Sequence, residues 1–359
     1  MWPESAEAEL VVDSAFYHGI AGCLAGSLTS CPLEVRSALR RAAMAQAMWE
    51  LRHRQLLATL LSALHNAGLR VLVLKGSALA YDLYDPPASR ARGDSDILVA
   101  PADVNLARAI LAEQGFAHYY DAPGADEAVR LQETWRRTTP EGYVHDIDLH
   151  WQALNAPALA HIISFEAAWS EAKALPKLSP HAFGLSRPMA LLLACAHRAQ
   201  HIIIPYFVDG RVYYADDRLI WLHDIDLLAR TLSTKEWADF VQLSATGGLV
   251  AVVFEGLQMA SRRFETPFPQ DVMASLARGP LDTPATRYLL SSRQAGRAWH
   301  DLRAASGLSG KINFLWGRLL PPEAFMRARY PQRSDEALLL LYLCRMIEFL
   351  KPRTGGRNS

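Results

Sequence analysis

The sequence predicts an α+β protein, in which a mixed β-sheet with helices is preceded by helices and followed by a helical domain. Three observations support this prediction. Short, β-favouring apolar runs lie between residues 68 and 178, and apolar residues recur at helical spacing on both sides of that region. The chain has 359 residues, 50% of them hydrophobic, which allows a large core divided into subdomains.

We therefore divide the chain into an N-terminal helical region (1–67), an αβ core (68–178), a C-terminal helical domain (179–350) and a disordered tail (351–359). The tail is assigned as disordered because it is rich in glycine and basic residues and has no apolar pattern.

The composition is typical of a soluble globular protein with no global charge. Lys and Arg together equal Asp and Glu at 37 each, so no overall field draws the chain to nucleic acid or to an anionic membrane. The four cysteines show no CxxC spacing and are interpreted as reduced thiols. The start of the chain lacks the features of a secretion signal, and its apolar runs fall short of the roughly 20 residues of a membrane span. We therefore expect a cytoplasmic protein with no membrane span.

The elements of the N-terminal region and the core follow from periodicity and from helix-ending residues. An Ala-rich amphipathic helix is expected from Leu33 to Ala67, with Gly68 as its C-terminal cap. A strand beginning at Val71 leads into Gly76-Ser77. The further elements expected in the core are a helix at Ala78–Tyr84, a strand at Asp94–Val99, a helix at Val104–Gln114, and strands at Leu131–Thr138 and Tyr143–Trp151. The segment Phe116–Tyr120 follows the second of these helices and is not assigned to a type of element.

The remainder of the chain is expected to be helical. Ser233 and Glu236 form a capping-box pattern at the start of one of these helices. The segment Pro205–Arg218 has no clear periodicity, and we expect a mobile loop there. The expected helices are Pro188–Ile203, Leu219–Thr231, Lys235–Thr246, Val250–Arg262 and Asp335–Leu350.

Two acidic residues open the strand that begins at Asp94. Because strand side chains alternate between faces, Asp94 and Asp96 project from one face and Ser95 from the other. Such a carboxylate pair repels itself unless a cation lies between, and Mg²⁺ is the usual partner of such oxygen ligands. In the preceding turn, Gly76 lets backbone N–H groups approach a phosphate closely. The two features together predict a metal-nucleotide site.

This arrangement resembles a known motif. Gly76-Ser77 after a strand, followed by Asp94-Ser95-Asp96 at the start of the next, resembles the nucleotidyltransferase motif of the DNA polymerase β superfamily. The chain is similar in particular to a bacterial family labelled uncharacterised nucleotidyltransferase. The residues that carry this resemblance are Lys75, Arg90, Asp94-Ser95-Asp96-Ile97-Leu98-Val99, Asp148-Leu149-His150-Trp151, His197, Arg218–Asp224 and Arg318–Pro322.

The resemblance implies a polymerase-β-like core and transfer of a nucleoside monophosphate from a nucleoside triphosphate (NTP), with release of pyrophosphate. It implies Mg²⁺, with Mn²⁺ as the alternative, held by Asp94 and Asp96 and completed by a third carboxylate. Asp146 and Asp148 share one strand face, so periodicity does not separate them; the motif favours Asp148, and Asp146 is then a supporting or substrate-facing acid. Replacing Asp94 or Asp96 by Asn should abolish transfer and, by removing repulsion, could raise the stability of the metal-free protein.

The residues expected to bind the nucleotide are Lys75, Gly76, Ser77, Arg90 and Arg92. Simpler interpretations remain open for several of them. Lys75 is either a phosphate ligand, a partner of one of the aspartates or a surface lysine at a strand end, and Arg92 is either a phosphate ligand or a counter-ion. The Asp94–Asp96 pair alone is also compatible with a solvated strand end.

Four further polar residues carry a structural and a functional interpretation. His150 shares the face of Asp148 and is either a partner at the site or a packed histidine. His197 and His201, four apart on one helix face, are interpreted as structural or substrate-lining. Asp224 is interpreted as a packing contact between helices, with a role in substrate binding as the alternative.

The acceptor stays open among a sugar, a peptide, a protein side chain and RNA, as does the choice of base. Two rival functions also stay open. One is a nucleotide-binding regulatory or interaction protein without turnover, and the other is a toxin-like enzyme that modifies tRNA.

Overall fold

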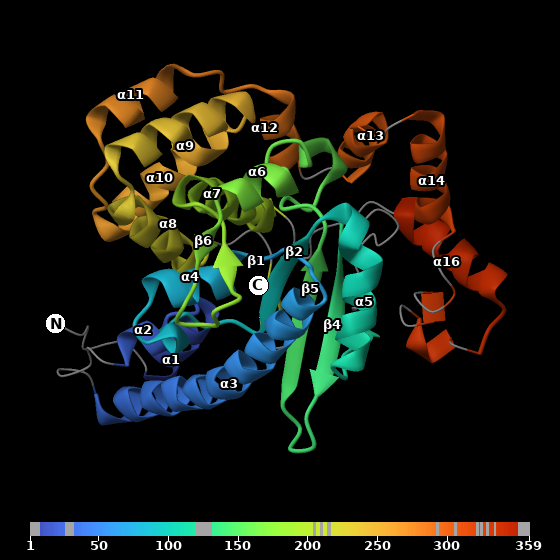
Figure 1. Ribbon diagram of the computed structural model, residues 1–359, viewed down its shortest axis with the longest axis horizontal. Coiled ribbons are helices and arrows are strands. Elements are labelled where there is room, and N and C mark those ends of the chain that lie inside the picture. The colour runs from blue at the N-terminus through green and yellow to red at the C-terminus, as the bar shows by residue number, and fades with distance from the viewer. Residues whose placement is uncertain are drawn as a thin grey trace.

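The computed structural model describes residues 8–25, 32–119, 131–203, 206–208, 211–213, 217–291, 294–304, 307–320, 323, 326–327, 330–333 and 335–350. The predicted disordered tail (351–359) and Cys31 lie outside these residues. The architecture is a mixed sheet with helices on both faces, as the sequence predicts (Figure 1).

Seven strands form the central sheet, in the order β3-β4-β5-β2-β1-β7-β6. β2 pairs with β1 in antiparallel and with β5 in parallel orientation, so the sheet is mixed. The strands are β1 (Val71–Val73), β2 (Asp94–Val99), β3 (Ala117–Tyr119), β4 (Gln132–Thr138), β5 (Val144–His150), β6 (Lys173–Ala174) and β7 (Phe183–Gly184).

Helices surround this sheet, with the long α3 along one side and the C-terminal helices beyond the other (Figure 1). The helices before the last strand of the sheet are α1 (Ala8–Tyr17), α2 (Ala21–Leu24), α3 (Leu33–Asn66), α4 (Lys75–Leu83), α5 (Val104–Glu113) and α6 (Phe165–Ser170). Those that follow are α7 (Arg187–Ile203), α8 (Leu219–Thr231), α9 (Thr234–Thr246), α10 (Val250–Phe264), α11 (Gln270–Arg278), α12 (Pro284–Leu289), α13 (Gln294–Ala304), α14 (Gly307–Leu319) and α16 (Leu338–Leu350).

The two faces of the sheet belong to two different hydrophobic cores. Val71 and Ile97 pack in the core that contains the leucines of α3 and the apolar face of α5. Leu72 and Leu98 pack in a separate core with α7, α8 and α10. Because side chains alternate along a strand, the even-numbered residues of β2 face the C-terminal helices. The acidic side chains at positions 94 and 96 therefore lie on that side.

Most of the expected elements are present within a few residues. The capping box at Ser233 and Glu236 is formed, and Gly68 follows α3 with a φ of 83°. Two expectations need correction. The helix after β1 begins at Lys75 and not at Ala78, so Gly76-Ser77 form its first turn. Within the segment predicted as a loop, Pro205–Arg218, the structure describes two antiparallel strands, β8 (Tyr206–Val208) and β9 (Arg211–Tyr213).

No helix in the described part of the chain combines the length and the hydropathy needed to cross a bilayer. The predicted domain boundary at residue 178 falls between β6 and β7, which pair with each other, so the sheet continues past it.

Candidate active site

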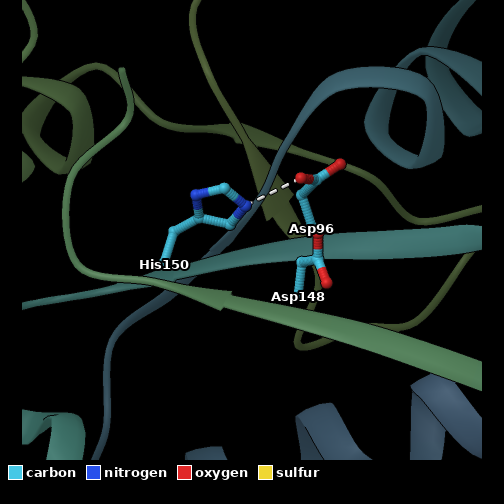
Figure 2. A group of neighbouring side chains, drawn as sticks. All are labelled: Asp96, Asp148 and His150. Carbon is cyan, nitrogen blue, oxygen red and sulfur yellow. Dashed lines mark hydrogen bonds and ion pairs between the residues drawn. The ribbon is translucent and has the colours of Figure 1, made fainter. Parts of the chain in front are cut away.

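The parallel pairing of β2 and β5 brings the predicted acidic residues side by side. Asp94 lies opposite Asp146 and Asp96 opposite Asp148 in the register of the two strands. Ligand atoms of Asp96, Asp148 and His150 all lie within 4.8 Å of one another, and Figure 2 shows these three side chains converging. Asp94 sits two residues before Asp96 on the same face, outside this closest group.

Asp96 is the anionic centre of the site. Its carboxylate accepts a hydrogen bond from His150 Nε2 at 2.7 Å and forms an ion pair with Lys75. Burial disfavours the charged form of Asp96, but Lys75 and His150 outweigh burial and hold its pKa well below the usual range. Burial and the charge of Lys75 lower the pKa of His150, so its ring is neutral at pH 7. The neutral ring must then carry its proton on Nε2, because an ionised carboxylate only accepts.

The pKa values of Asp94 and Asp148 are shifted in the opposite direction, upwards. Loss of hydration within the site and the charge of Asp96 raise the pKa of Asp94. Burial and the charges of Asp94 and Asp96 raise the pKa of Asp148. Each carboxylate therefore ionises at a cost that a bound cation would remove. Three oxygen donors of this kind fit the ligand preference of Mg²⁺, whereas a contribution from the His150 nitrogen would favour a softer ion such as Mn²⁺.

The structure also distinguishes Asp146 from Asp148. Asp146 is held by the Arg136 guanidinium through two hydrogen bonds of 2.8 and 2.7 Å. Asp148 accepts hydrogen bonds from two neutral side chains, Thr134 at 2.6 Å and Gln132 at 3.0 Å. Asp146 thus already has a full counter-charge, and Asp148 does not.

The turn between β1 and α4 has the geometry of an anion site. Lys75 adopts a left-handed backbone conformation, with a φ of 47°, which is strained for a residue with a side chain. Leu74 supplies no capping side chain to the start of α4, so the first N–H groups of the helix are available to an anion. A Cβ on Gly76 would lie 3.1 Å from the Arg90 guanidinium carbon, so only glycine fits without displacing Arg90.

Both predicted phosphate-binding arginines are buried and paired with carboxylates. Arg90 donates to Asp224 of α8 through Nε at 2.9 Å and Nη2 at 2.7 Å, and the Tyr84 hydroxyl donates to the same carboxylate at 2.7 Å. Arg92 pairs with Glu50 of α3 at 2.7 Å. The counter-ion of Arg92 is therefore Glu50 and not Asp94. Contact of either arginine with phosphate stays a prediction.

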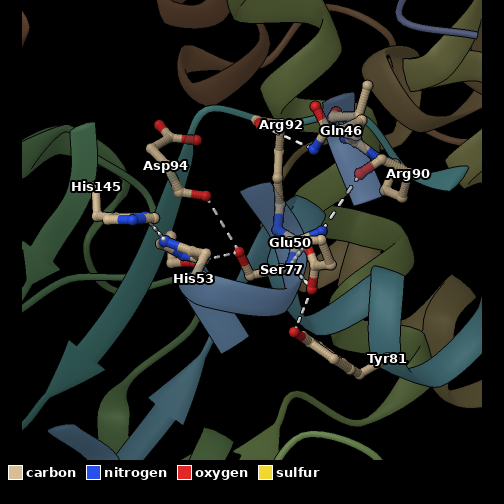
Figure 3. Close-up of polar contacts among 11 residues, drawn as sticks. Gln46, Glu50, His53, Ser77, Tyr81, Arg90, Arg92, Asp94 and His145 are labelled. Carbon is tan, nitrogen blue, oxygen red and sulfur yellow. Dashed lines mark hydrogen bonds and ion pairs between the residues drawn. The ribbon is translucent and has the colours of Figure 1, made fainter. Parts of the chain in front are cut away.

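A buried chain of hydrogen bonds runs beneath β2, on the α3 side (Figure 3). Ser77 donates to the Asp94 carbonyl at 3.3 Å and lies 2.7 Å from Ser95. His53 Nε2 lies 2.6 Å from Ser95, and its Nδ1 lies 3.1 Å from His145 Nδ1. The hydroxyl of Ser77 has one proton, which it donates to the Asp94 carbonyl, so Ser95 must donate to Ser77. For the same reason His53 donates to Ser95, and His145 donates to His53. Burial lowers the pKa of both rings, which keeps them neutral for this order.

A cavity of about 590 Å³ lies between the sheet and the C-terminal helices. Its lining includes the turn at Lys75–Ser77 and the acidic residues of β2 and β5, as well as Arg90 and Arg92, so the structure gathers every predicted site residue around one cavity. His197, His201 and Trp221 complete the lining on the helical side.

The sequence analysis assigns no role to three residues that support the site: Glu50, His53 and His145. The first two carry a signal, because Glu50 and His53 continue the buried stripe of Leu57, Leu60 and Leu64 towards the N-terminus of α3. Polar residues at core positions of an amphipathic helix indicate buried partners. His145 carries no such signal.

The comparison with known families agrees with this geometry. A search of the curated proteins finds no match. The family model described as "Uncharacterised nucleotidyltransferase" matches residues 4–265, a range that ends at α10 and leaves Arg318–Pro322 outside. The match spans most of the chain, including the whole sheet and every residue of the cavity described above. The chain therefore belongs to this family of nucleotidyltransferases.

Proposed function

We propose that the protein is a Mg²⁺-dependent nucleotidyltransferase that transfers a nucleoside monophosphate from an NTP to an acceptor and releases pyrophosphate. The observation that carries this proposal is the pairing of Asp96 with Asp148 across β2 and β5, beside an uncapped helix start at Lys75–Ser77. Carboxylates gather metal ions and a helix N-terminus binds phosphate, so the two halves of a metal-nucleotide complex have adjacent binding groups.

In this proposal Asp94, Asp96 and Asp148 hold the divalent ion. When bound, the ion neutralises charge on the triphosphate and lowers the pKa of the attacking hydroxyl. The backbone N–H groups of Gly76 and Ser77 bind phosphate oxygens. An acceptor oxygen then attacks the α-phosphorus while the bond from that phosphorus to the pyrophosphate oxygen breaks, and the Asp148 carboxylate is the proposed acceptor of the hydroxyl proton.

The paired arginines support this site from behind. Arg90 packs under Gly76 and is fixed by Asp224, while Arg92 is fixed by Glu50. Both pairs therefore hold the turn and the start of β2 in place. Since both arginines are among the residues that line the cavity, each also supplies positive potential to a triphosphate.

The experiment is a pyrophosphate-release assay with each of the four NTPs and Mg²⁺, in the presence of candidate acceptors of each class: sugar, peptide, protein and RNA. Asp148→Asn should abolish release, whereas the matched variant Asp146→Asn should retain most of it, because Asp146 is neutralised by Arg136. Full release in Asp148→Asn would overturn the assignment. Metal-dependent binding without release would favour the regulatory rival, and release only with tRNA would favour the toxin-like enzyme.

A further inference from the structure

Three aromatic rings form one wall of the cavity on the side of the C-terminal helices. His197 and His201 of α7 have ring centroids 4.3 Å apart. Trp221 of α8 lies against both, with centroid separations of 5.8 Å from His197 and 5.5 Å from His201. We call these three side chains the ring wall. All three line the same cavity as the acidic residues of the sheet.

The ring wall offers hydrogen bonds without charge. Burial lowers the pKa of His197 and of His201, to about 4 for the latter, so both imidazoles are neutral at pH 7. A neutral imidazole has one donor and one acceptor nitrogen. A cation, Arg218, lies beside this wall: its guanidinium is 5.7 Å from the Trp221 ring centroid, and its Nε donates to the Tyr17 carbonyl. Most of this wall is thus aromatic and uncharged, unlike the phosphate-binding side of the cavity.

The ring wall is close to the catalytic groups. The charges of Lys75 and Asp96 act on both imidazoles, and α4 contacts α7 and α8 directly. The turn at Lys75–Ser77, the carboxylates and the rings therefore all border one cavity. Its volume of about 590 Å³ lies in the range of pockets that enclose a whole small ligand.

We propose that the ring wall is the nucleobase subsite, in which the base of the NTP lies against Trp221 and hydrogen-bonds through its edge to His197 and His201. This inference rests on the proposed function, because it takes the turn at Lys75–Ser77 as the triphosphate site. The base of an NTP is a planar heterocycle whose edge carries hydrogen-bond donors and acceptors. A flat ring can stack on Trp221, and its edge can pair with the donor and acceptor nitrogens of neutral imidazoles. The Gln200 amide, which also lines the cavity, is a further candidate for the base edge.

The test compares a ligand that has a base with one that has none. Binding of ATP, GTP, CTP, UTP and inorganic tripolyphosphate is measured by calorimetry with Mg²⁺ in the full-length protein. His197→Phe and His201→Phe keep a ring but remove both nitrogens. His65→Phe is the matched control, because His65 stacks on His181 and does not line the cavity. Thermal unfolding of each variant confirms that it is folded.

We expect the wild type to bind one NTP more tightly than tripolyphosphate. Each of the two cavity variants should lower that preference by at least about 5-fold, the loss expected for one hydrogen bond, and leave tripolyphosphate binding within about 2-fold. Unchanged preference in both variants, with or without a loss of transfer, would overturn the inference and assign the rings to the acceptor or to packing. If neither tripolyphosphate nor any NTP binds, the proposed function itself fails, which this experiment separates from failure of the subsite.

Discussion

Replacing Asp224 by Asn tests the buried ion pair that connects Arg90, beside the turn at Lys75–Ser77, to the C-terminal helices. Asp224 is 4% exposed and Arg90 is 7% exposed. The carboxylate accepts hydrogen bonds from Arg90 Nε, Arg90 Nη2 and the Tyr84 hydroxyl. Asn has a similar shape, but it removes the negative charge and turns an N–H group towards the guanidinium. The variant therefore leaves a buried cation without its counter-ion.

Removing one partner of a buried pair costs about 3–5 kcal/mol, and we expect a loss of this size for Asp224→Asn. The assay is urea unfolding followed by tryptophan fluorescence, since Trp221 lies one turn before Asp224 on α8. The matched control is Asp239→Asn, which breaks the exposed pair with Lys235 and should cost less than about 1 kcal/mol.

A second variant separates charge from packing. Arg90→Met combined with Asp224→Leu removes both charges, and replacing a buried pair with apolar residues is often close to neutral. The double variant should therefore be more stable than Asp224→Asn alone. The reasoning is refuted if Asp224→Asn is no more destabilising than Asp239→Asn.

Three further predictions concern the turn, the buried chain and the carboxylates. Gly76→Ala places a methyl group 3.1 Å from the fixed Arg90 guanidinium, so it should lower the free energy of unfolding by about 1–3 kcal/mol and weaken tripolyphosphate binding. The control is Gly93→Ala, because a Cβ at Gly93 meets nothing within 4 Å. Equal effects of the two substitutions would contradict this account. His53→Ala leaves Ser95 and His145 without a shared partner and should lower the free energy of unfolding by about 1–3 kcal/mol, a result that urea unfolding checks and that an unchanged midpoint would exclude. The folded state raises the pKa of Asp148, so ionisation of Asp148 destabilises the metal-free protein as pH rises through that pKa. Asp148→Asn should therefore raise the unfolding temperature, measured with a chelator, more at pH 8 than at pH 5. The same difference in unfolding temperature between variant and wild type at both pH values would contradict this sign.

The structure predicts different effects on stability for Asp94→Asn and Asp96→Asn. The sequence predicts that removing either Asp94 or Asp96 relieves repulsion in the metal-free protein. Only Asp94 has a raised pKa, whereas Asp96 is stabilised by Lys75 and His150. Asp94→Asn should therefore stabilise the metal-free protein, and Asp96→Asn should destabilise it.

Features set by local periodicity are the ones that the sequence predicts well. Strand alternation places Asp94 and Asp96 on one face and Ser95 on the other, and the hydrogen bond between Ser95 and His53 of α3 confirms it. The order of strand, turn, helix and strand likewise follows from apolar runs and helix-ending residues.

Features that depend on contacts distant in sequence are not predictable in this way. The carboxylate that holds Arg90 lies 134 residues away and the one that holds Arg92 lies 42 residues away, so no local pattern names them. The choice of Asp148 over Asp146 rests on a motif in the sequence. In the structure it rests on Arg136 of the neighbouring strand, which neutralises only Asp146.

The central claim is that Asp94, Asp96 and Asp148 bind a divalent ion together with a nucleoside triphosphate. Calorimetric titration of each NTP with Mg²⁺ into the wild type and Asp148→Asn tests it most directly. The account predicts metal-dependent binding of at least one NTP, weakened by at least about 100-fold in the variant, since even a residue that only orients a metal ligand costs 10–100-fold in affinity. Absence of binding of every NTP to the wild type, or equal binding to Asp148→Asn, would contradict it.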